Sequence, residues 1–495
     1  MNNASKVSII GGGLGGISAA ISLATEGYDV ELYEKNDHLG GKLNQKTIEG
    51  FTFDLGPSIL TMPHIFEELF TRADKKMTDY VDIQKLDLQW RNFFEDGTSL
   101  DLYEDIEKIH KVNPTLNVDD KRDLEEYLSY AEDIYEVVEE GYFEAGVDTF
   151  FEAFKFYGLF TSMRGLDYFS TMHDGVSRYI DDPHLQKVID FFIKYVGSSP
   201  YDAPAVLNLL PYIQFEYGLW YVEGGMYNLA EGLKELMDEL GVKVHLNSEV
   251  VNLSAVGNEI RELELEDGSV QETELVVSNM EVIPAYEELL TGHKKLLKKY
   301  KKKFEPACSG LVVHLGLDKE YEQLDHHNFF FSKDPKEHFA SVFTRKELPK
   351  DPTLYVVAVS KTDQTQAPEG CENLKILPHI PHLQDEPFSA QDYEKLTERV
   401  LDKLERMGLK DLREHIIVED TWNPQDIQNN YYSNRGAIYG VIADRKKNKG
   451  FKAPKKSSEY NNLYFVGGSV NPGGGMPMVT LSGQQVRDMI LEDHK

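Results

Sequence analysis

A glycine-rich turn near the N-terminus restricts the fold of this chain more than any other feature. The turn has the spacing G-x-G-x-x-G and consists of Gly11, Gly12, Gly13, Leu14, Gly15 and Gly16. It separates an apolar run at 7–10, which predicts a strand, from a run at 17–26, which predicts a helix. Such a turn lets the backbone approach a pyrophosphate and points the first N–H groups of the helix at it. The turn therefore predicts a dinucleotide-binding fold.

An acidic residue supports this interpretation. Glu34 ends the next predicted strand, at 29–33, and lies 18 residues after Gly16. In dinucleotide-binding folds an acid at an offset of about 20 residues bonds the adenosine ribose. A carboxylate at this place favours a free 2′-hydroxyl, and therefore FAD or NAD over NADP.

Two further glycine turns narrow the choice of cofactor. They are Gly40-Gly41-Lys42 and Gly56-Pro57. Nicotinamide-binding domains do not need these turns, whereas a flavin protein that threads its ring past the first strands does. The sequence holds no second G-x-G-x-x-G for a nicotinamide nucleotide. We therefore expect FAD as the cofactor.

A glycine cluster near the C-terminus, at 473–475, lies between a predicted strand at 463–466 and a predicted helix at 480–492. Glycines at this place would let the backbone reach the edge of a flavin ring. The N-terminus of the helix would then stabilise negative charge on the reduced flavin. The predicted cofactor contacts in this region are Gly468, Ser469, Gly475 and Met476.

Composition and charge exclude several classes of protein. The chain has 495 residues and a net charge of −32, which disfavours nucleic acid as a partner. It has no apolar run of about 18 residues, so no transmembrane helix is expected. Cys308 and Cys371 are the only cysteines and have no metal-ligand spacing, which fits the reducing cytosol and predicts neither a disulfide framework nor a metal site.

Basic residues are concentrated in two segments, Lys294–Lys303 and Arg445–Lys456, which contain no acid and are interleaved with apolar residues. One interpretation is that both are solvated faces of a soluble protein. The other is contact with a membrane surface, since each lysine near anionic head groups contributes about 1 kcal/mol of attraction.

The pattern along the chain predicts five segments. They are 1–105 (first part of the cofactor domain), 106–217 (a helical substrate or lid region), 218–289 (second part of the cofactor domain), 290–455 (substrate domain) and 456–495 (third part of the cofactor domain). We expect helices at 119–140 and 227–240. Strands are predicted at 242–246, 250–253, 260–265, 270–277, 311–317 and 354–359. The aromatic stretch Phe150, Phe151, Phe154, Phe156 and Phe160 is expected to belong to the core, or to the wall of a substrate tunnel.

Segments spread over nearly the whole chain resemble the phytoene desaturase-like carotenoid and retinoid oxidoreductases. Besides 7–55, they are GPSILTMP at 56–63, KYVGSS at 194–199, WYVEGGM at 220–226, SNMEVIP at 278–284, HHNFFF at 326–331, SNRGAIYG at 433–440 and FVGGSVNPGGGMPM at 465–478. Desaturases of 30-carbon carotenoids in this family typically carry His-Pro-Gly-Ala-Gly where this chain has Asn-Pro-Gly-Gly-Gly at 471–475. This difference favours the oxygenase branch of the family.

The resemblance implies an α/β fold. Its Rossmann-type FAD-binding domain would be of the amine-oxidase and phytoene-desaturase kind, assembled from three chain segments and joined to a mixed α+β substrate domain. It also implies that the backbone of Val250 meets the adenine. The implied location is cytoplasmic, on the inner face of the cell membrane, where a carotenoid substrate resides.

The implied reaction is FAD-dependent oxidation of the terminal methyl group of a 30-carbon carotenoid to the aldehyde. The alternative is a carotenoid desaturase of the same fold, and a third hypothesis is a non-catalytic flavoprotein scaffold at a membrane. Molecular oxygen or a quinone would accept the electrons. Two routes stay open: direct removal of electrons from the methyl carbon, or hydroxylation with oxygen followed by oxidation to the aldehyde.

No protein catalyst is predicted. His173, His314, His326 and His327 are candidates by residue type alone. His326 and His327 are expected on one strand with their side chains on opposite faces, so that both cannot line one site. The sequence contains no G-x-S-x-G signature of a serine hydrolase. Flavin chemistry needs little from the protein beyond positioning and electrostatics.

Overall fold

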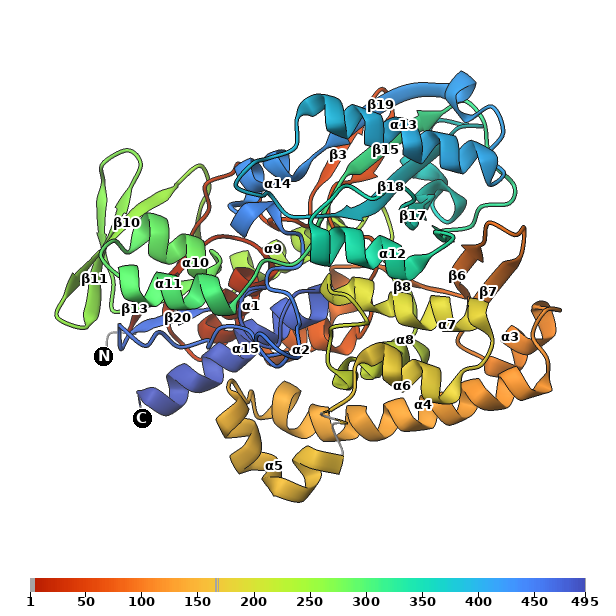
Figure 1. Ribbon diagram of the computed structural model, residues 1–495. Coiled ribbons are helices and arrows are strands. Elements are labelled where there is room, and N and C mark those ends of the chain that lie inside the picture. The colour runs from red at the N-terminus through yellow and green to blue at the C-terminus, as the bar shows by residue number, and fades with distance from the viewer. Residues whose placement is uncertain (1–4, 165–166, 168, 495) are drawn as a thin grey trace.

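The computed structural model describes residues 5–494 apart from 165, 166 and 168, and for 159–164 it describes the backbone only. Two large β-sheets organise the chain, helices pack around both, and the two ends of the chain lie on the same side of the molecule (Figure 1).

The first sheet has five parallel strands in the order β20-β13-β1-β2-β9. These strands are β1 (Lys6–Ile10), β2 (Asp29–Tyr33), β9 (Lys243–His245), β13 (Leu275–Ser278) and β20 (Leu463–Phe465). Val7, Ile9 and Leu32 are fully buried, as expected for a parallel sheet covered on both faces. The predicted α/β fold class is confirmed, and the sheet draws its strands from three distant parts of the chain.

Helices α1 (Leu14–Thr25) and α15 (Met476–Asp493) cross this sheet in close contact with each other. A Cβ atom on Gly483 would lie 2.6 Å from the backbone nitrogen of Ala19, so only glycine permits this approach. Both helices begin earlier than predicted, because each starts directly at its glycine turn. Their N-termini therefore lie at the same edge of the sheet. Helices α2 (His64–Arg72) and α9 (Asn228–Glu239) complete this layer.

The second sheet has eight strands and is antiparallel except between β16 and β6. In order across the sheet, its strands are β19 (Ile416–Trp422), β15 (Val312–Leu317), β18 (Glu372–Ile380), β17 (Leu354–Val357), β16 (His327–Phe330), β6 (Leu88–Phe93) and β7 (Ser99–Tyr103), with β14 (Ser309–Gly310) paired to β18. Thus β6 and β7, although they lie within 1–105, belong to this sheet.

Alternation along β18 gives the second sheet two different faces. Leu374 and Ile376 pack with Leu396 and Val400 of α13 (Ala390–Arg406). Lys375 and Leu377 point the other way and line a cavity. One face of the sheet is therefore core and the other is available for a site.

Smaller sheets join these parts, and one of them corrects a prediction. They are β3 (Gln45–Ile48) with β4 (Phe51–Asp54), β5 (Ile83–Leu86) with β8 (Leu219–Val222), and the meander β10 (Val250–Val256), β11 (Glu259–Leu265), β12 (Val270–Glu272). The single strand predicted at 270–277 is wrong: β12 pairs antiparallel with β11, whereas β13 turns away and joins the parallel sheet beside β1.

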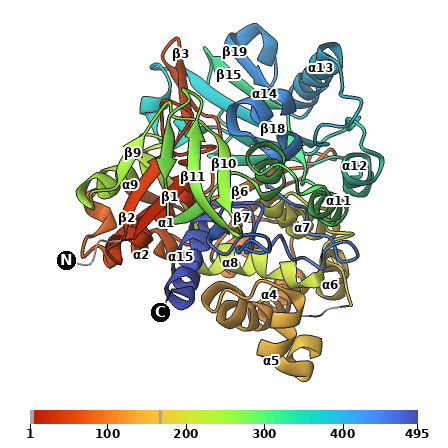
Figure 2. The same ribbon diagram turned by 90° about the vertical axis from the view of Figure 1, so that its left-hand side faces the viewer.

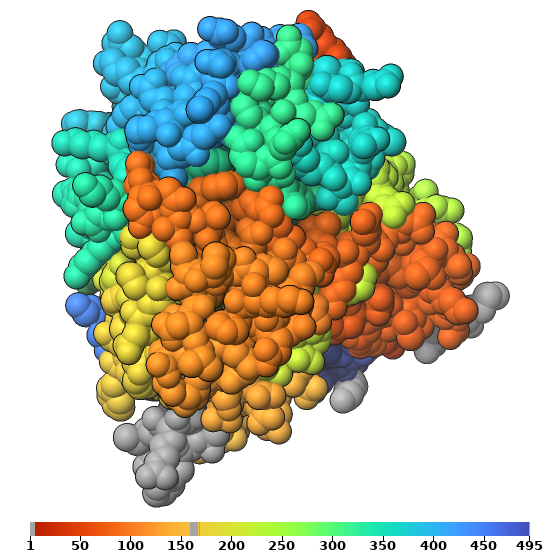
Figure 3. Space-filling view, turned by 90° about the vertical axis from the view of Figure 1, so that its right-hand side faces the viewer, coloured from red at the N-terminus to blue at the C-terminus, as the bar shows by residue number. Residues whose placement is uncertain are grey.

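The remaining helices surround these sheets. The helix predicted at 119–140 is α4 (Val118–Val138), which begins at a capping box between Asn117 and Asp120. The others are α3 (Ile106–Val112), α5 (Phe150–Arg164), α6 (Met172–Tyr179), α7 (Pro183–Asp190), α8 (Leu209–Tyr217), α10 (Val282–Pro284), α11 (Lys294–Lys303), α12 (Pro335–Phe339) and α14 (Pro424–Tyr431). Figure 3 shows the green-to-blue residues of the C-terminal half above the orange segment that contains α3 and α4.

A buried carboxylate in the second sheet makes stability depend on pH. The side chain of Glu372 is fully buried, accepts a hydrogen bond from the Tyr321 backbone at 2.7 Å and lies 3.4 Å from the Lys361 ammonium. Burial raises the pKa of Glu372 to about 7, above its unfolded value of about 4.3. The folded protein therefore keeps a proton that the unfolded chain loses, so this stabilisation is present below about pH 4 and is lost as the pH rises through 7.

We expect the free energy of unfolding of the wild-type protein, relative to Glu372→Gln, to fall by about 3 kcal/mol between about pH 4.5 and 8. Denaturant unfolding of both proteins with saturating FAD across this range measures it. Glu369→Gln, at an exposed position nearby, is the matched control and should show no such trend. A difference between wild type and Glu372→Gln that does not vary with pH would contradict the expectation.

Candidate functional site

A cavity of about 1390 Å³ lies between the two large sheets. Ile10, Tyr33 and Asn279, at the carboxyl ends of β1, β2 and β13, line one part of it. Ligands of open α/β sheets bind at this edge. The other part reaches the second sheet at Tyr355 and Lys375. Because pockets for single small ligands usually measure about 300–1,000 Å³, this cavity has room for a cofactor and a second large ligand.

The N-terminal glycine turn forms one end of the cavity. Gly11, Gly13, Leu14 and Gly15 line it. No side chain caps the N-terminus of α1 at Gly13, so its first N–H groups are available to an anion. Gly12 and Gly16 are not among the lining residues. Gly16 serves packing instead, because a Cβ atom there would lie 2.1 Å from the Gly11 carbonyl oxygen.

Glu34 also lines the cavity, beside the glycine turn. One carboxylate oxygen accepts a hydrogen bond from the Gly12 backbone N–H at 2.7 Å, and the other accepts one from the Asn36 N–H at 2.9 Å. These two bonds hold the carboxylate in place at the end of β2. Its contact with a ribose stays a prediction.

The second glycine turn packs directly on the first. The Gly40 N–H donates to the Gly12 carbonyl at 2.8 Å, and a Cβ atom on Gly41 would lie 3.1 Å from the Gly13 Cα atom. Gly40, Gly41 and Lys42 line the cavity. The two turns therefore form one cradle in which side chains would fill the space left for a ligand.

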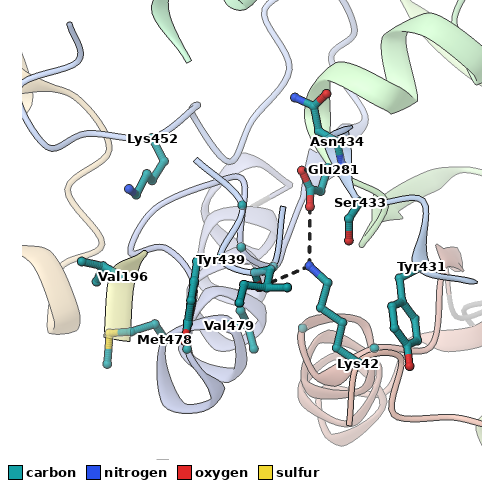
Figure 4. Close-up of a pocket in the computed structure, with 18 of the residues that line it drawn as sticks. Lys42, Val196, Glu281, Tyr431, Ser433, Asn434, Tyr439, Lys452, Met478 and Val479 are labelled. Atoms are coloured by element: carbon teal, nitrogen blue, oxygen red, sulfur yellow. Dashed lines mark hydrogen bonds and ion pairs between the residues drawn. The ribbon is translucent and has the colours of Figure 1, made fainter. Parts of the chain in front are cut away.

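Lys42 links the N-terminal segment to two distant parts of the chain. Its Nζ donates to the Ala437 carbonyl at 3.1 Å and lies 3.8 Å from the Glu281 carboxylate (Figure 4). Burial lowers the pKa of Lys42 and raises the pKa of Glu281, and in each case the charge of the partner opposes the shift. The pair closes one side of the cavity without a net charge.

Most of the other predicted contacts also lie in the cavity wall. They are Gly56, Pro57, Val250, Gly468, Gly475 and Met476. Ser469 is not among the lining residues, because its hydroxyl accepts a hydrogen bond from the Val282 N–H at 3.0 Å. Helix α15 begins at Gly475, which has φ 108° and no side-chain cap, so a second uncapped helix N-terminus faces the cavity.

Beyond the glycine turns the cavity wall becomes apolar. Its side chains there include Val138, Phe143, Val147, Leu209, Ile213 and Met478. Met478 and Val479 lie beside Tyr439 in this wall (Figure 4). A long hydrocarbon would fit such a surface, because no polar group would lose its hydrogen bonds to water.

Two buried lysines in the wall were not singled out from the sequence. They are Lys194, which follows α7, and Lys375, on β18. The Lys375 Nζ donates to the Gly56 carbonyl and, at 3.0 Å, to the Ser58 hydroxyl. Burial lowers the pKa of Lys375 to about 8, and the nearby Asp54 opposes this shift. A lysine within the otherwise apolar run at 374–378 was the available signal for Lys375.

The expectation that His326 and His327 point to opposite faces of one strand was wrong. Their ring centroids lie 4.4 Å apart, because β16 begins only at His327 and strand alternation does not extend to His326. His326 lies 2.8 Å from the Thr362 hydroxyl, and His327 lies 2.9 Å from the Tyr355 hydroxyl. Burial lowers the pKa of His326 to about 3. Neither ring is among the cavity-lining side chains.

The other candidate histidines lie outside the cavity. His173 pairs with Asp190 at 2.7 Å, and His314 pairs with Asp420 at 3.3 Å. The histidine in the cavity wall is His382, which the sequence did not indicate. Within the described ranges, no group of three His, Cys, Asp or Glu side chains is arranged to hold a metal ion.

The aromatic stretch of α5 is not part of the core, contrary to one of the two expectations. Phe151 is 76% exposed, and Phe150, Phe154 and Phe156 are at least 40% exposed. Phe160 lies among the residues whose side chains are not described. Ala153 and Tyr157 of the same helix line the cavity. Helix α5 therefore covers the cavity while presenting a row of exposed rings.

The two basic segments differ in how many of their lysines are exposed. All seven lysines of α11 are exposed, and Lys301 and Lys302 border the cavity. In the second segment, Lys452 and Lys455 are buried, and Lys455 forms a 2.5 Å ion pair with Asp148. Hence only part of the second segment is a solvated or membrane-facing surface. Of the helices in the described part of the chain, none has the length and apolarity to cross a membrane.

The matches to known proteins agree with this architecture. Residues 14–490 match the family described as flavin containing amine oxidoreductase. The chain belongs to this family. It is accordingly an FAD-dependent oxidoreductase. The two uncapped helix N-termini and the paired glycine turns fit FAD, because they offer backbone N–H groups to phosphates where a Cβ atom would obstruct them.

Two similar proteins of this family carry functional names. The chain is 57% identical to 4,4′-diaponeurosporene oxygenase of Staphylococcus haemolyticus (strain JCSC1435), over 98% of this chain and 97% of that protein. It is 58% identical to 4,4′-diapolycopene oxygenase of Methylomonas sp, over 99% of each chain. The predicted resemblance to carotenoid oxidoreductases is confirmed, and within it the oxygenases are favoured over the desaturases.

Solved structures share the fold at low sequence identity. An oxidoreductase from Methanosarcina mazei matches with a TM-score of 0.67 and 16% identity, over 98% of this chain and 100% of that one. Putrescine oxidase bound to putrescine matches with a TM-score of 0.67 and 15% identity, over 99% of each chain.

Proposed function

We propose that this enzyme oxidises the terminal methyl group of a 30-carbon carotenoid, such as 4,4′-diaponeurosporene or diapolycopene, to the aldehyde. The observation that carries the proposal is the continuity of the cavity, in which a glycine-lined end opens into an apolar end. The names of the two relatives at 57% and 58% identity give the class of substrate.

FAD would be held by the lining glycines of the first two turns, by Glu34 and Lys42, by Gly56 and Pro57, by the backbone of Val250, and by Gly468, Gly475 and Met476. When bound, it accepts electrons from the substrate and passes them to an acceptor, for which oxygen or a quinone is proposed. The chain itself contributes positioning: apolar side chains such as Phe143 and Ile213 exclude water and hold the hydrocarbon next to the glycine-lined end.

The test is expression in cells that accumulate 4,4′-diaponeurosporene, followed by mass spectrometry of the extracted pigment. We expect a product that has gained one oxygen and lost two hydrogens, which is the change from methyl to aldehyde. Cells that carry the Gly13→Val variant, expected to lack FAD, serve as the control. A product changed only by loss of hydrogen would instead identify a desaturase, and unchanged pigment would contradict both activities.

We further propose that the enzyme is cytoplasmic and binds the inner face of the cell membrane through one continuous surface. This surface, called the docking face below, consists of α11, the exposed part of the second basic segment and the exposed rings of α5. The Lys449 ammonium lies 3.8 Å from the centre of the Phe150 ring, which joins the second segment to α5. The pKa of Lys303 is lowered mainly by burial and also by Lys299 and Lys449, so α11 lies near the same segment.

The position of the docking face supports a role in substrate uptake. In Figure 2 the blue C-terminal segment lies between α11 and α5. Lys301, Lys302, Lys447 and Lys449 border the cavity, and Ala153 and Tyr157 of α5 do so as well. Lysines that attract anionic head groups, next to rings that enter the lipid, suit a protein that lies on a bilayer. A carotenoid could then pass from the membrane into the cavity without crossing water.

A further inference from the structure

Lys194 lies inside a cage of aromatic rings at the cavity wall. Its side chain is 4% exposed and lines the cavity. The Nζ atom lies 4.2 Å from the ring centre of Tyr355, 4.6 Å from Tyr195, 5.1 Å from Phe329 and 5.2 Å from Trp90. The rings hold the amine at one place in the wall.

The amine has no polar partner in the part of the chain that the structure describes, neither a hydrogen bond nor an ion pair. Other buried lysines do: Lys403 pairs with Asp351 at 2.7 Å, and Lys455 pairs with Asp148. Burial, together with the charge of Lys375, holds the pKa of Lys194 well below its usual range. In either protonation state the amine keeps N–H donors, and a buried donor without an acceptor is unfavourable.

The polar groups nearest to the Lys194 amine do not accept hydrogen bonds from it. The Tyr195 hydroxyl donates to Gln214 at 2.6 Å, and the Tyr355 hydroxyl lies 2.9 Å from His327. Lys375, whose charge acts on Lys194, donates to the carbonyl of Gly56, a predicted cofactor contact. The free donors of Lys194 therefore face the same cavity that Lys375 and Gly56 line.

A purely hydrocarbon ligand offers no acceptor to this amine, whereas a chain end that carries oxygen does. We propose that Lys194 donates a hydrogen bond to the oxygen of an alcohol or aldehyde at the end of a long apolar chain, and so forms a subsite for a chain end that is already oxidised. This inference deepens the proposed function and rests on it, because such a chain end is the intermediate or product of that reaction.

A subsite for the oxidised chain end would keep the alcohol bound between the two oxidation steps. On the route by electron removal, the methyl carbon loses two electrons and a proton to FAD and the acceptor, and water adds to that carbon with loss of a proton to give an alcohol. A second loss of two electrons and two protons gives the aldehyde, so the alcohol must stay in place between the two oxidations. A hydrogen bond from Lys194 holds the alcohol beside the site of the first oxidation. Lys194 is in this sense a residue that determines specificity for the oxidised chain end.

The experiment compares two probes on the purified FAD-loaded enzyme, a 30-carbon polyene hydrocarbon and its terminal aldehyde, each titrated by quenching of tryptophan fluorescence. We expect Lys194→Met to raise the dissociation constant of the aldehyde about tenfold relative to that of the hydrocarbon. Lys194→Gln, which keeps an N–H donor, should recover part of this ratio. In the wild type the bound aldehyde should absorb at longer wavelength than in Lys194→Met, because hydrogen bonding to a conjugated carbonyl lowers its excitation energy.

Lys187→Met is the matched control, since Lys187 also lies over an aromatic ring, 5.9 Å from the centre of Phe94, but is not among the cavity-lining residues. Its ratio of dissociation constants should equal that of the wild type. An unchanged ratio and absorption in Lys194→Met, with FAD retained, would overturn the proposal. The two proposals can fail separately, because the titration measures binding and not turnover. A wild-type enzyme that binds the aldehyde through Lys194 but oxidises no methyl group would refute the proposed function and leave the Lys194 subsite standing.

Discussion

Gly13→Val is expected to leave the purified protein without bound FAD. Gly13 lies at the N-terminus of α1 in the cradle formed by the first two glycine turns. A valine side chain would occupy the space where a pyrophosphate approaches the backbone N–H groups. The ratio of flavin to protein, measured from the absorbance of flavin released on denaturation, should fall from about one to near zero.

Two further variants separate loss of the cofactor from loss of the fold. A Cβ atom on Gly13 would lie 2.6 Å from the Asn279 side-chain nitrogen, so Gly13→Val is also made together with Asn279→Ala to remove this contact. Thr25→Val, an isosteric change at the other end of α1, should retain FAD. Stoichiometric FAD in Gly13→Val, or its return in the double variant, would refute pyrophosphate binding at this turn.

Replacing Phe151 and Phe154 by serine is expected to weaken binding to anionic vesicles about 100-fold. Each ring is exposed in the protein and would transfer to the lipid with about 1.5–3 kcal/mol of stabilisation when fully buried, and with part of that at the interface. Cosedimentation with phosphatidylglycerol vesicles measures the effect. Val256→Ser with Val270→Ser, at exposed positions of the β10–β12 meander, is the matched control and should bind as the wild type does.

The charges of the docking face are tested in the same assay. Replacing the seven lysines of α11 by glutamine should weaken binding to anionic vesicles and remove most of its dependence on salt. Binding to neutral phosphatidylcholine vesicles should change little. If neither the serine nor the glutamine variants bind more weakly than the wild type, both surfaces are solvated and the proposal of a docking face is wrong.

Features that depend on neighbours in the sequence could be predicted. The turn at 11–16 follows from the spacing of its glycines, because only glycine allows close approach of a helix to a strand and of a ligand to both. The same holds for the glycine cluster before α15. Helix α4 was predicted to within two residues at each end, since its apolar residues recur at helical spacing.

Features that depend on pairing between distant segments could not be predicted from the sequence. The apolar run at 270–277 divides between two sheets, because the strand that neighbours β13 in space is β1, which lies far away in the sequence. The rings of α5 look like core residues to a pattern of hydrophobicity, but Phe151, Phe154 and Phe156 are 76%, 42% and 50% exposed in the structure. The lysines in 445–456 look equally basic, although Lys452 and Lys455 are buried and Lys455 pairs with Asp148 from a distant part of the chain.

The sequence by itself determined the cofactor class and the positions of the glycine turns, because backbone geometry at glycines and the alternation of strand and helix are local properties. Only the tertiary structure decided what shares the cavity with the cofactor. It places Lys194 among rings from β6, β16 and β17, brings Lys375 to Gly56, and lets residues of both α5 and α11 line the cavity. These arrangements depend on the free energy of packing distant segments together, which no local pattern encodes.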